Sequence, residues 1–198
     1  MKVYSLTVIF TEPLLGTVTL DPEIYAAWIS KNVPDAKSLK EELETLGTEE
    51  VLEKGTTGFH RVDGTPILYD YVIKGFLKDA CSMLRRVPGT LSHGIRAYRK
   101  IIDGLVFVTP RRIPINLNGS DITFLERPLR ASTAQGERIA LARSETVAPG
   151  ASITFTLSVL GAIKEPQLRE WFDYGALRGL GQWRNASYGR FSYEMAEQ

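Results

Sequence analysis

Two segments near opposite ends of the chain carry apolar residues at every second position, and the later one alternates strictly between apolar and polar residues. Apolar side chains stand at every second position of residues 153–159, and residues 4–10 repeat this pattern. Because successive side chains of a strand point to opposite faces, each segment predicts a strand with one buried face. A sheet with one apolar face needs a second layer of structure to cover that face.

Two amphipathic segments are predicted to supply this layer. Residues 73–86 place apolar side chains at i, i+3, i+4, i+7, i+8 and i+11, the period of a helix, and residues 166–176 carry a second such stripe. Further strands are expected at residues 101–108, 111–114 and 122–125, the first of them bent at a central Asp-Gly pair. This order indicates an α+β protein with a ferredoxin-like or RRM-like antiparallel sheet and helices on one face.

We expect a single RRM-like domain over residues 1–198 with two additions. Residues 21–54 are acidic and have helical features, so they predict an insertion packed on the main domain. Residues 125–149 are rich in arginine, hold few acids and end in a Pro-Gly turn. This second segment predicts a projecting, thumb-like hairpin.

Charge is unevenly distributed along the chain although the formal net charge is only +1. Residues 1–70 hold 6 Lys/Arg and 12 Asp/Glu, a balance of −6, whereas residues 71–198 hold 18 and 11, a balance of +7. A nearly neutral protein of this kind can still carry a basic face, so the later part is where a polyanion is expected to bind.

Several classes of site and location are not indicated by the sequence. Cys81 is the only cysteine, so neither an intrachain disulfide nor a cysteine metal cluster can form, and its place on the apolar stripe predicts burial. No spaced cluster of His, Asp or Glu indicates a metal, and no cofactor is expected. No apolar stretch is long enough to span a bilayer, so we expect a cytoplasmic protein without a membrane partner.

Glycines, arginines and aromatic residues interleave in residues 179–191, just before the last predicted strand. Glycine lets the backbone approach a polyanion closely, arginine neutralises phosphate, and Trp183 and Tyr188 offer flat faces for stacking. The alternative interpretation is a glycine turn leading into an edge strand, with Trp183 covering the core. Three basic residues of the first helix share one line, which predicts either a solvated edge or part of a binding site: Lys74, Lys78 and Arg85.

Three motifs follow one another along the chain in an order that indicates a known family. They are the turn and helix start at residues 63–80, the segment 145–155 before a strand, and the glycine-rich loop at 179–191. Together they resemble the RAMP superfamily, the repeat-associated RNA-binding proteins of CRISPR effector complexes, and most of all its backbone subunits. The resemblance spans residues 1–195, with residues 21–54 matching least.

The resemblance implies a non-catalytic protein that grips single-stranded or guide-like RNA between the first helix, the thumb and the glycine-rich loop. It further implies association with copies of the same chain or with other effector-complex subunits, in or against a CRISPR effector. Phosphate contacts of this kind carry little sequence preference. The implied nucleic-acid contacts are Lys74, Lys78, Arg85, Arg127, Arg130, Gly179, Gly181, Trp183, Arg184 and Arg190.

Two alternative functions remain open from the sequence. The first is a metal-independent endoribonuclease of the same superfamily, with His60 or His93 as the general acid or base. The sequence identifies no partner for either histidine, and Asp63 belongs to an Asp-Gly pair typical of turns, so a binder is favoured over an enzyme. The second is a phage or mobile-element protein that binds small nucleotides or a partner protein.

Overall fold

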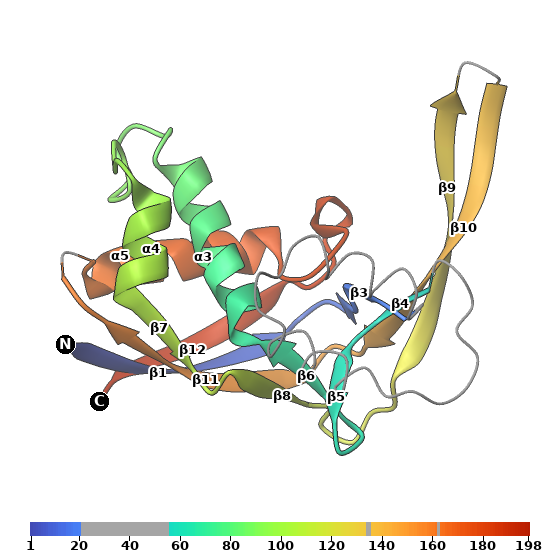
Figure 1. The fold of residues 1–198 in the computed structure, drawn as a ribbon, viewed down its shortest axis with the longest axis horizontal. Helices are drawn as coiled ribbons and strands as arrows, with labels where there is room; N and C mark the ends of the chain where they lie inside the picture. Colours follow the sequence, from blue (N-terminus) through green and yellow to red (C-terminus); the bar gives the residue numbers. More distant parts are fainter. Residues whose placement is uncertain (21–55, 134–135, 162) are drawn as a thin grey trace, which may run out of the picture.

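The computed structural model describes residues 1–20, 56–133, 136–161 and 163–198. Its main layer has the order β-α-β-β-α-β, and both ends of the chain lie at the same end of the molecule (Figure 1). The elements of this layer are β1 (Lys2–Phe10), α3 (Asp70–Leu84), β7 (Val106–Thr109), β11 (Ser152–Val159), α5 (Glu165–Arg178) and β12 (Phe191–Glu197). The acidic segment predicted at 21–54 lies outside the described residues.

The sheet of this layer has the strand order of a ferredoxin-like fold. β1 lies at the centre between β11 and β12, and β7 pairs with the other edge of β11, every pairing being antiparallel. Leu6 is opposite Phe155 on one side and Met195 on the other. The α+β fold with an antiparallel sheet is therefore confirmed.

Three shorter strands extend the sheet beyond β11. They are β8 (Arg112–Asn116), β6 (Thr65–Tyr69) and β5 (His60–Val62), and each pairs antiparallel with its neighbour. Asp63 and Gly64 form the two-residue turn between β5 and β6 with φ of 48° and 77°. Positive φ at both positions is the geometry that Asp-Gly hairpin turns favour, as the sequence predicts.

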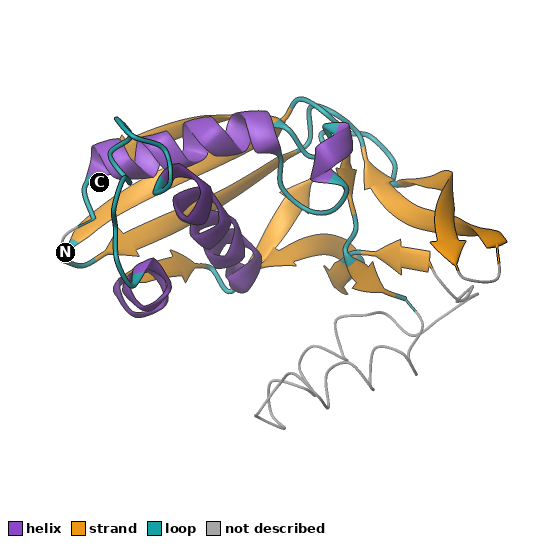
Figure 2. Cartoon of the chain, turned by 90° about the horizontal axis from the view of Figure 1, so that it is seen from above, coloured by secondary structure: helices purple, strands orange, loops and turns teal. Residues whose placement is uncertain are grey.

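The helices cover one face of the sheet, as seen from the side and from above (Figures 1 and 2). Trp171 and Phe172 of α5 are each 1% exposed, and Phe76 of α3 packs on Phe172 with ring centroids 5.3 Å apart. A Cβ at Gly175 would overlap the Phe76 ring, so this glycine permits the close contact between α3 and α5. Cys81 is buried among the same helices, and burial raises the pKa of its thiol to about 11.

The strand predicted over residues 101–108 is wrong in its first half. The chain forms helix α4 (Tyr98–Leu105) and becomes extended only at β7. Tyr98, Ile102 and Leu105 stand at i, i+4 and i+7, so the apolar positions also satisfy a helical period. The pair of β-branched isoleucines favours a strand locally, but burial of Tyr98 and Ile102 against α3 stabilises the helix.

A second, smaller sheet carries a long hairpin that projects from the body of the molecule (Figure 1). β9 (Thr123–Thr133) and β10 (Gly136–Val147) pair antiparallel from Thr123↔Thr146 to Thr133↔Gly136. The base of β10 also pairs with β2 (Leu14–Leu15) and β4 (Thr56–Gly58), and β4 with β3 (Val18–Thr19). Among the described residues, the strands that pair with the hairpin all do so at its base.

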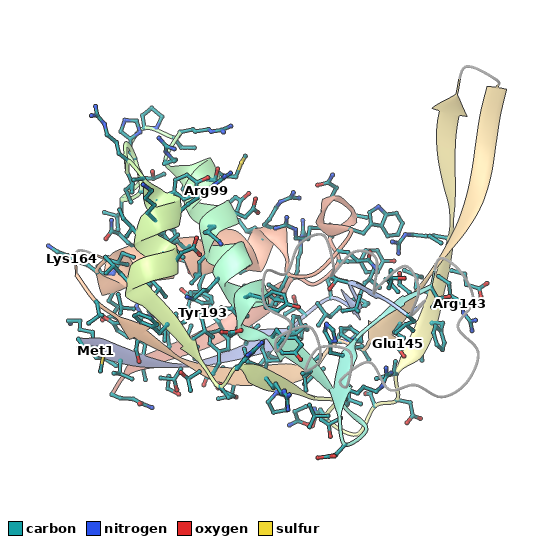
Figure 3. The ribbon with its side chains drawn as sticks, viewed as in Figure 1. Met1, Arg99, Arg143, Glu145, Lys164 and Tyr193 are labelled. Atoms are coloured by element: carbon teal, nitrogen blue, oxygen red, sulfur yellow. The ribbon has the colours of Figure 1, made fainter. Side chains whose placement is uncertain are left out.

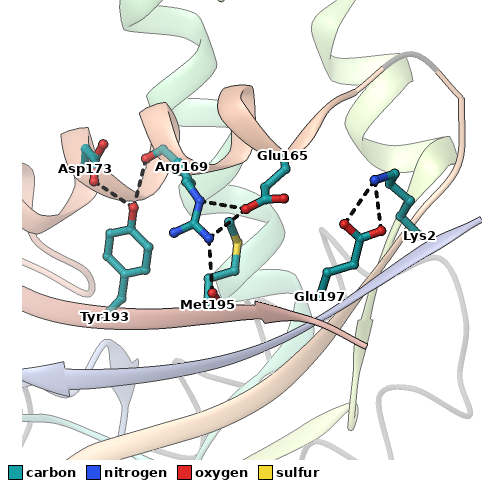
Figure 4. A network of polar contacts seen from close by, with 7 residues as sticks. All are labelled: Lys2, Glu165, Arg169, Asp173, Tyr193, Met195 and Glu197. Atoms are coloured by element: carbon teal, nitrogen blue, oxygen red, sulfur yellow. Dashed lines mark hydrogen bonds and ion pairs between the residues drawn. The ribbon is translucent and has the colours of Figure 1, made fainter.

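Polar contacts join α5 to the edge strand β12 (Figure 4). Arg169 pairs with Glu165 at 2.7 Å and donates to the carbonyl of Met195 at 3.2 Å. The Tyr193 hydroxyl donates to Asp173 at 2.7 Å, and burial together with this carboxylate raises the pKa of Tyr193 to about 12. These contacts hold the helix that precedes the glycine-rich loop onto the strand that follows it.

Candidate nucleic-acid interface

The glycine-rich loop between α5 and β12 closes tightly on itself. Gly179, Gly181 and Gly189 have φ of 88°, 82° and 70°, a region that favours glycine. A Cβ at Gly189 would overlap the carbonyl oxygen of Leu180, and one at Gly179 that of Tyr188. Since the Leu180 amide also donates to the Gly189 carbonyl at 2.9 Å, these glycines first of all let the two arms of the loop meet.

Trp183 joins this loop to the base of the hairpin. Its ring stacks on that of Tyr188, with centroids 5.1 Å apart and 10° between the planes. The guanidinium of Arg127, from β9, lies over the indole at 4.3 Å from its centroid. Within the described part of the chain, Nε and Nη1 of Arg127 are buried and have no hydrogen-bond partner. Loop and hairpin thus form one surface with a cation stacked on an aromatic pair.

Gln182 fixes the loop to the second sheet, a role that no sequence pattern indicates. Its Nε2 atom lies 2.6 Å from the carbonyl oxygen of Gly16 and 2.8 Å from each of the hydroxyls of Thr57 and Ser144. The three acceptors come from separate segments of the chain. The conformation of the loop is therefore set by long-range contacts in addition to its glycines.

The arginines predicted as phosphate contacts in the loop already have partners in the chain. Arg184 forms an ion pair with Asp79 of α3 at 2.7 Å, and both side chains are partly buried. Arg190 donates from Nε to the carbonyl of Leu177 at 2.8 Å. Arg178, at the end of α5, donates to Asn185 at 2.6 Å. These contacts hold the arginines near the loop and connect it to α3.

The basic line of α3 is turned toward α4 and β7, away from the glycine-rich loop. Lys78 pairs with Asp103 of α4 at 2.8 Å. Lys74 donates to the Asp103 carbonyl at 3.3 Å and lies 5.4 Å from the ring centroid of Phe107. Arg85 lies over the ring of Tyr98 at 5.3 Å. The structure therefore brings Arg127, Trp183 and Arg184 near one loop and places the three α3 residues elsewhere.

Arg130 belongs to the projecting part of the hairpin. Its backbone pairs with that of Ile139 in the register of β9 and β10. The residue therefore lies beyond Arg127 along β9, further from the body of the molecule.

The two histidines occupy very different environments. His60 is 4% exposed, and its ring meets the edge of Tyr69 at a centroid distance of 4.9 Å. Burial lowers the pKa of His60 to about 4, because a charged ring would lose its hydration. His93 is exposed in the segment between α3 and α4. His60 is therefore closed off from the surface, whereas His93 is open to solvent.

We expect His60 to make the protein less stable in mild acid. The unfolded chain takes up a proton near pH 6.5, whereas the folded chain resists it until about pH 4. Stability is therefore complete above pH 6.5 and is lost as the pH falls toward 4. The free energy of unfolding, measured in urea, should drop by about 2 kcal/mol more between pH 7 and pH 5 in the wild type than in His60→Phe. Equal drops in the two proteins would contradict this assignment.

A buried carboxylate lies beneath the interface. Glu145 of β10 is 5% exposed and accepts a hydrogen bond from the backbone N–H of Phe59 at 2.9 Å. It also forms an ion pair with Arg61. A Cβ at Gly58 would overlap its Oε2 atom, so the glycine makes room for the carboxylate. Glu145 and Arg143 lie at the base of the hairpin in Figure 3.

Two structural features are absent from the described residues. No group of three or more His, Cys, Asp or Glu side chains is arranged there to hold a metal ion. Within the same residues, no helix combines the length and apolar character needed to cross a lipid bilayer.

No protein-family model matches this sequence, and no curated protein matches it. The fold is similar to a chain in the cryo-EM structure of the Type III-B Cmr-beta bound to cognate target RNA, with a TM-score of 0.55 and 13% identity. That match covers 99% of this chain and 60% of the other, so this chain spans little more than half of its neighbour. A chain of a Type IV-B CRISPR complex matches with a TM-score of 0.47 and 11% identity, over 98% and 90% of the two chains. The structural neighbours are thus subunits of CRISPR complexes, and the first likeness shows a shared fold.

Proposed function

We propose that this chain is a non-catalytic RNA-binding subunit of a CRISPR-type effector assembly, or a protein that acts against one. The observation that carries the proposal is the stack of Arg127, Trp183 and Tyr188, which joins the glycine-rich loop to the base of the hairpin. Cations and aromatic faces side by side are the chemistry that single-stranded nucleic acid requires. The neighbour of similar fold that is bound to target RNA supports the same class of ligand.

The polar atoms of Arg127 support a phosphate as the ligand. Nε and Nη1 lack a hydrogen-bond partner within the described residues, and stacking on Trp183 fixes the plane of the guanidinium. Both atoms are buried, so the positive charge of Arg127 is left without a counter-charge among the described residues, and a phosphate at the rim of the stack would neutralise it. Arg184 and Arg190 belong to the same loop, where Arg184 pairs with Asp79 and Arg190 donates to the Leu177 carbonyl.

The environments of the histidines favour a binder over an endoribonuclease. A general base must reach the proton that it removes and have a pKa near the working pH. His60 is buried with a pKa of about 4, and Asp63 forms a hairpin turn. His93 is the other histidine of this chain, and it is exposed. Replacement of His93 by alanine therefore distinguishes a binder from an endoribonuclease, because a histidine-dependent cleavage product would disappear in the variant.

Partners of this chain are also part of the proposal. We expect copies of the same chain or other effector subunits to contact the projecting hairpin, since it extends from the body (Figure 1) and its pairing with other described strands is at its base.

The test is a fluorescence anisotropy titration of the wild-type protein with labelled single-stranded RNA at several salt concentrations. We expect binding at low salt, with an association constant whose logarithm falls by about 0.7 per phosphate contact for each tenfold rise in salt. The RNA should remain intact after incubation. Absence of binding at low salt, or binding indifferent to salt, would contradict the proposal.

A further inference from the structure

The segment that connects α3 to α4 is strongly basic. Five Lys/Arg and no Asp/Glu occur from Ala80 to Ile102, and the five lie between residues 85 and 100. They are Arg85, Arg86, Arg96, Arg99 and Lys100. We call residues 85–100 the basic loop. A run of cations without intervening acids produces a local positive potential that the net charge of +1 conceals.

The basic loop is held in place by α5. Both carboxylate oxygens of Glu170 accept hydrogen bonds from it, from the Leu91 amide at 2.6 Å and from the Ser92 amide and hydroxyl at 3.0 and 2.6 Å. The buried indole N–H of Trp171 donates to the same Ser92 hydroxyl at 2.7 Å. Glu170 is thus engaged with the backbone of the basic loop at residues 91 and 92 and holds this part of the loop against α5.

Four of the five cations of the basic loop lie at the surface. Arg86, Arg96, Arg99 and Lys100 are exposed. Among the described residues, Arg86, Arg96 and Lys100 form no ion pair, while Arg99 contacts the ring and hydroxyl of Tyr98. Exposed cations that neither pair with an acid nor pack on the core are available to an external anion.

The basic loop lies on the same side of the molecule as the first site. Figure 1 shows this loop, the glycine-rich loop and the hairpin on the face of the sheet that carries the helices. Figure 3 places Arg99 at the outer end of α4 on that side. Asp79, the partner of Arg184, lies five residues before the end of α3, which is about 7.5 Å of helix, and Arg86 follows two residues after that end.

We propose that the basic loop is a second contact for the RNA backbone, which extends the interface from the hairpin and glycine-rich loop along α3 to α4. The inference rests on the proposed function, because it assumes that RNA occupies the first site. A continuous polyphosphate suits it, since the cations follow one another without an acidic residue between them and share the side of the first site. An acidic protein surface is the competing ligand.

The test compares two double variants of the full chain with the wild type. Arg96→Gln with Lys100→Gln removes two exposed cations of the basic loop. Lys2→Gln with Arg111→Gln removes the same charge away from the basic loop, since Lys2 pairs with Glu197 on β12 and Arg111 lies between β7 and β8. Each protein is titrated by anisotropy with oligouridylates of about 6 and about 24 nucleotides over a range of salt. Circular dichroism checks that both variants are folded.

We expect the basic-loop variant to bind the long RNA about 25-fold more weakly at about 0.1 M salt, with a salt slope smaller by about 1.4. The short RNA should bind it as it binds the wild type, and the control variant should match the wild type with both. Unchanged affinity and slope for the long RNA would overturn the inference while leaving the proposed function intact. That result, combined with altered self-association on sizing, would assign the basic loop to a protein partner. Failure of the wild type itself to bind would overturn both proposals.

Discussion

Replacement of Glu145 by alanine should lower the free energy of unfolding by about 3–5 kcal/mol. The carboxylate is buried, accepts from the Phe59 amide and pairs with Arg61, so its removal leaves a donor and a partly buried cation without their acceptor. The effect should be visible as a lower urea midpoint with an unchanged slope.

A matched control comes from an exposed carboxylate of the same hairpin. Glu126 lies 3.4 Å from Arg143, and its side chain is 55% exposed. Replacement of Glu126 by alanine should change the free energy of unfolding by less than about 1 kcal/mol, because water screens exposed pairs. A Glu145→Ala protein no less stable than the Glu126→Ala protein would contradict the structural role of the buried carboxylate.

The main layer of the fold could be predicted from the sequence because burial imposes a period on each element. The alternation in residues 153–159 appears as β11, and that in residues 4–10 as part of β1. The helical stripe at 73–86 corresponds to α3, which begins three residues earlier, at Asp70. Each of these elements buries one face against a single neighbouring layer, and this is the condition under which periodicity is informative.

Helix α4 shows where such patterns fail. The segment 98–105 is short, contains the pair Ile101-Ile102 and is followed by a strand. Its apolar positions therefore fit the period of a strand almost as well as that of a helix. The contact of Tyr98 and Ile102 with the core decides between them, and this contact joins residues distant in sequence. Local preference is weak compared with tertiary packing in segments of this length.

The sequence also does not predict which element of the fold the charged side chains face. Helical spacing correctly places Lys74, Lys78 and Arg85 on one line, but it does not say which element that line faces. Lys78 pairs with Asp103 and Arg85 lies over Tyr98, and both partners belong to α4, which was not predicted. Gln182 was missed for a similar reason, because its three acceptors are brought together only by the folded chain.

The second large effect is expected on RNA affinity. Arg127→Ala combined with Trp183→Ala should weaken binding of single-stranded RNA about 100-fold, because it removes one phosphate contact and one aromatic platform. It also removes the stack that joins the glycine-rich loop to β9. Loss of affinity should be similar for RNAs of different sequence, since a cation and a π face read no base edges.

The control for this variant removes another cation and aromatic ring that lie close together, at a different place in the fold. Lys74 lies 5.4 Å from the ring centroid of Phe107, between α3 and β7, and this pair is turned away from the loop. Lys74→Ala combined with Phe107→Ala removes a cation and an aromatic ring without touching the hairpin.

The most direct test of the account is therefore the RNA dissociation constant of three proteins measured side by side by anisotropy at one salt concentration. We predict that the Lys74/Phe107 variant binds like the wild type and that the Arg127/Trp183 variant loses about two orders of magnitude. Equal affinity of the Arg127/Trp183 variant and the wild type, or a greater loss in the Lys74/Phe107 variant, would contradict an interface at the loop and hairpin.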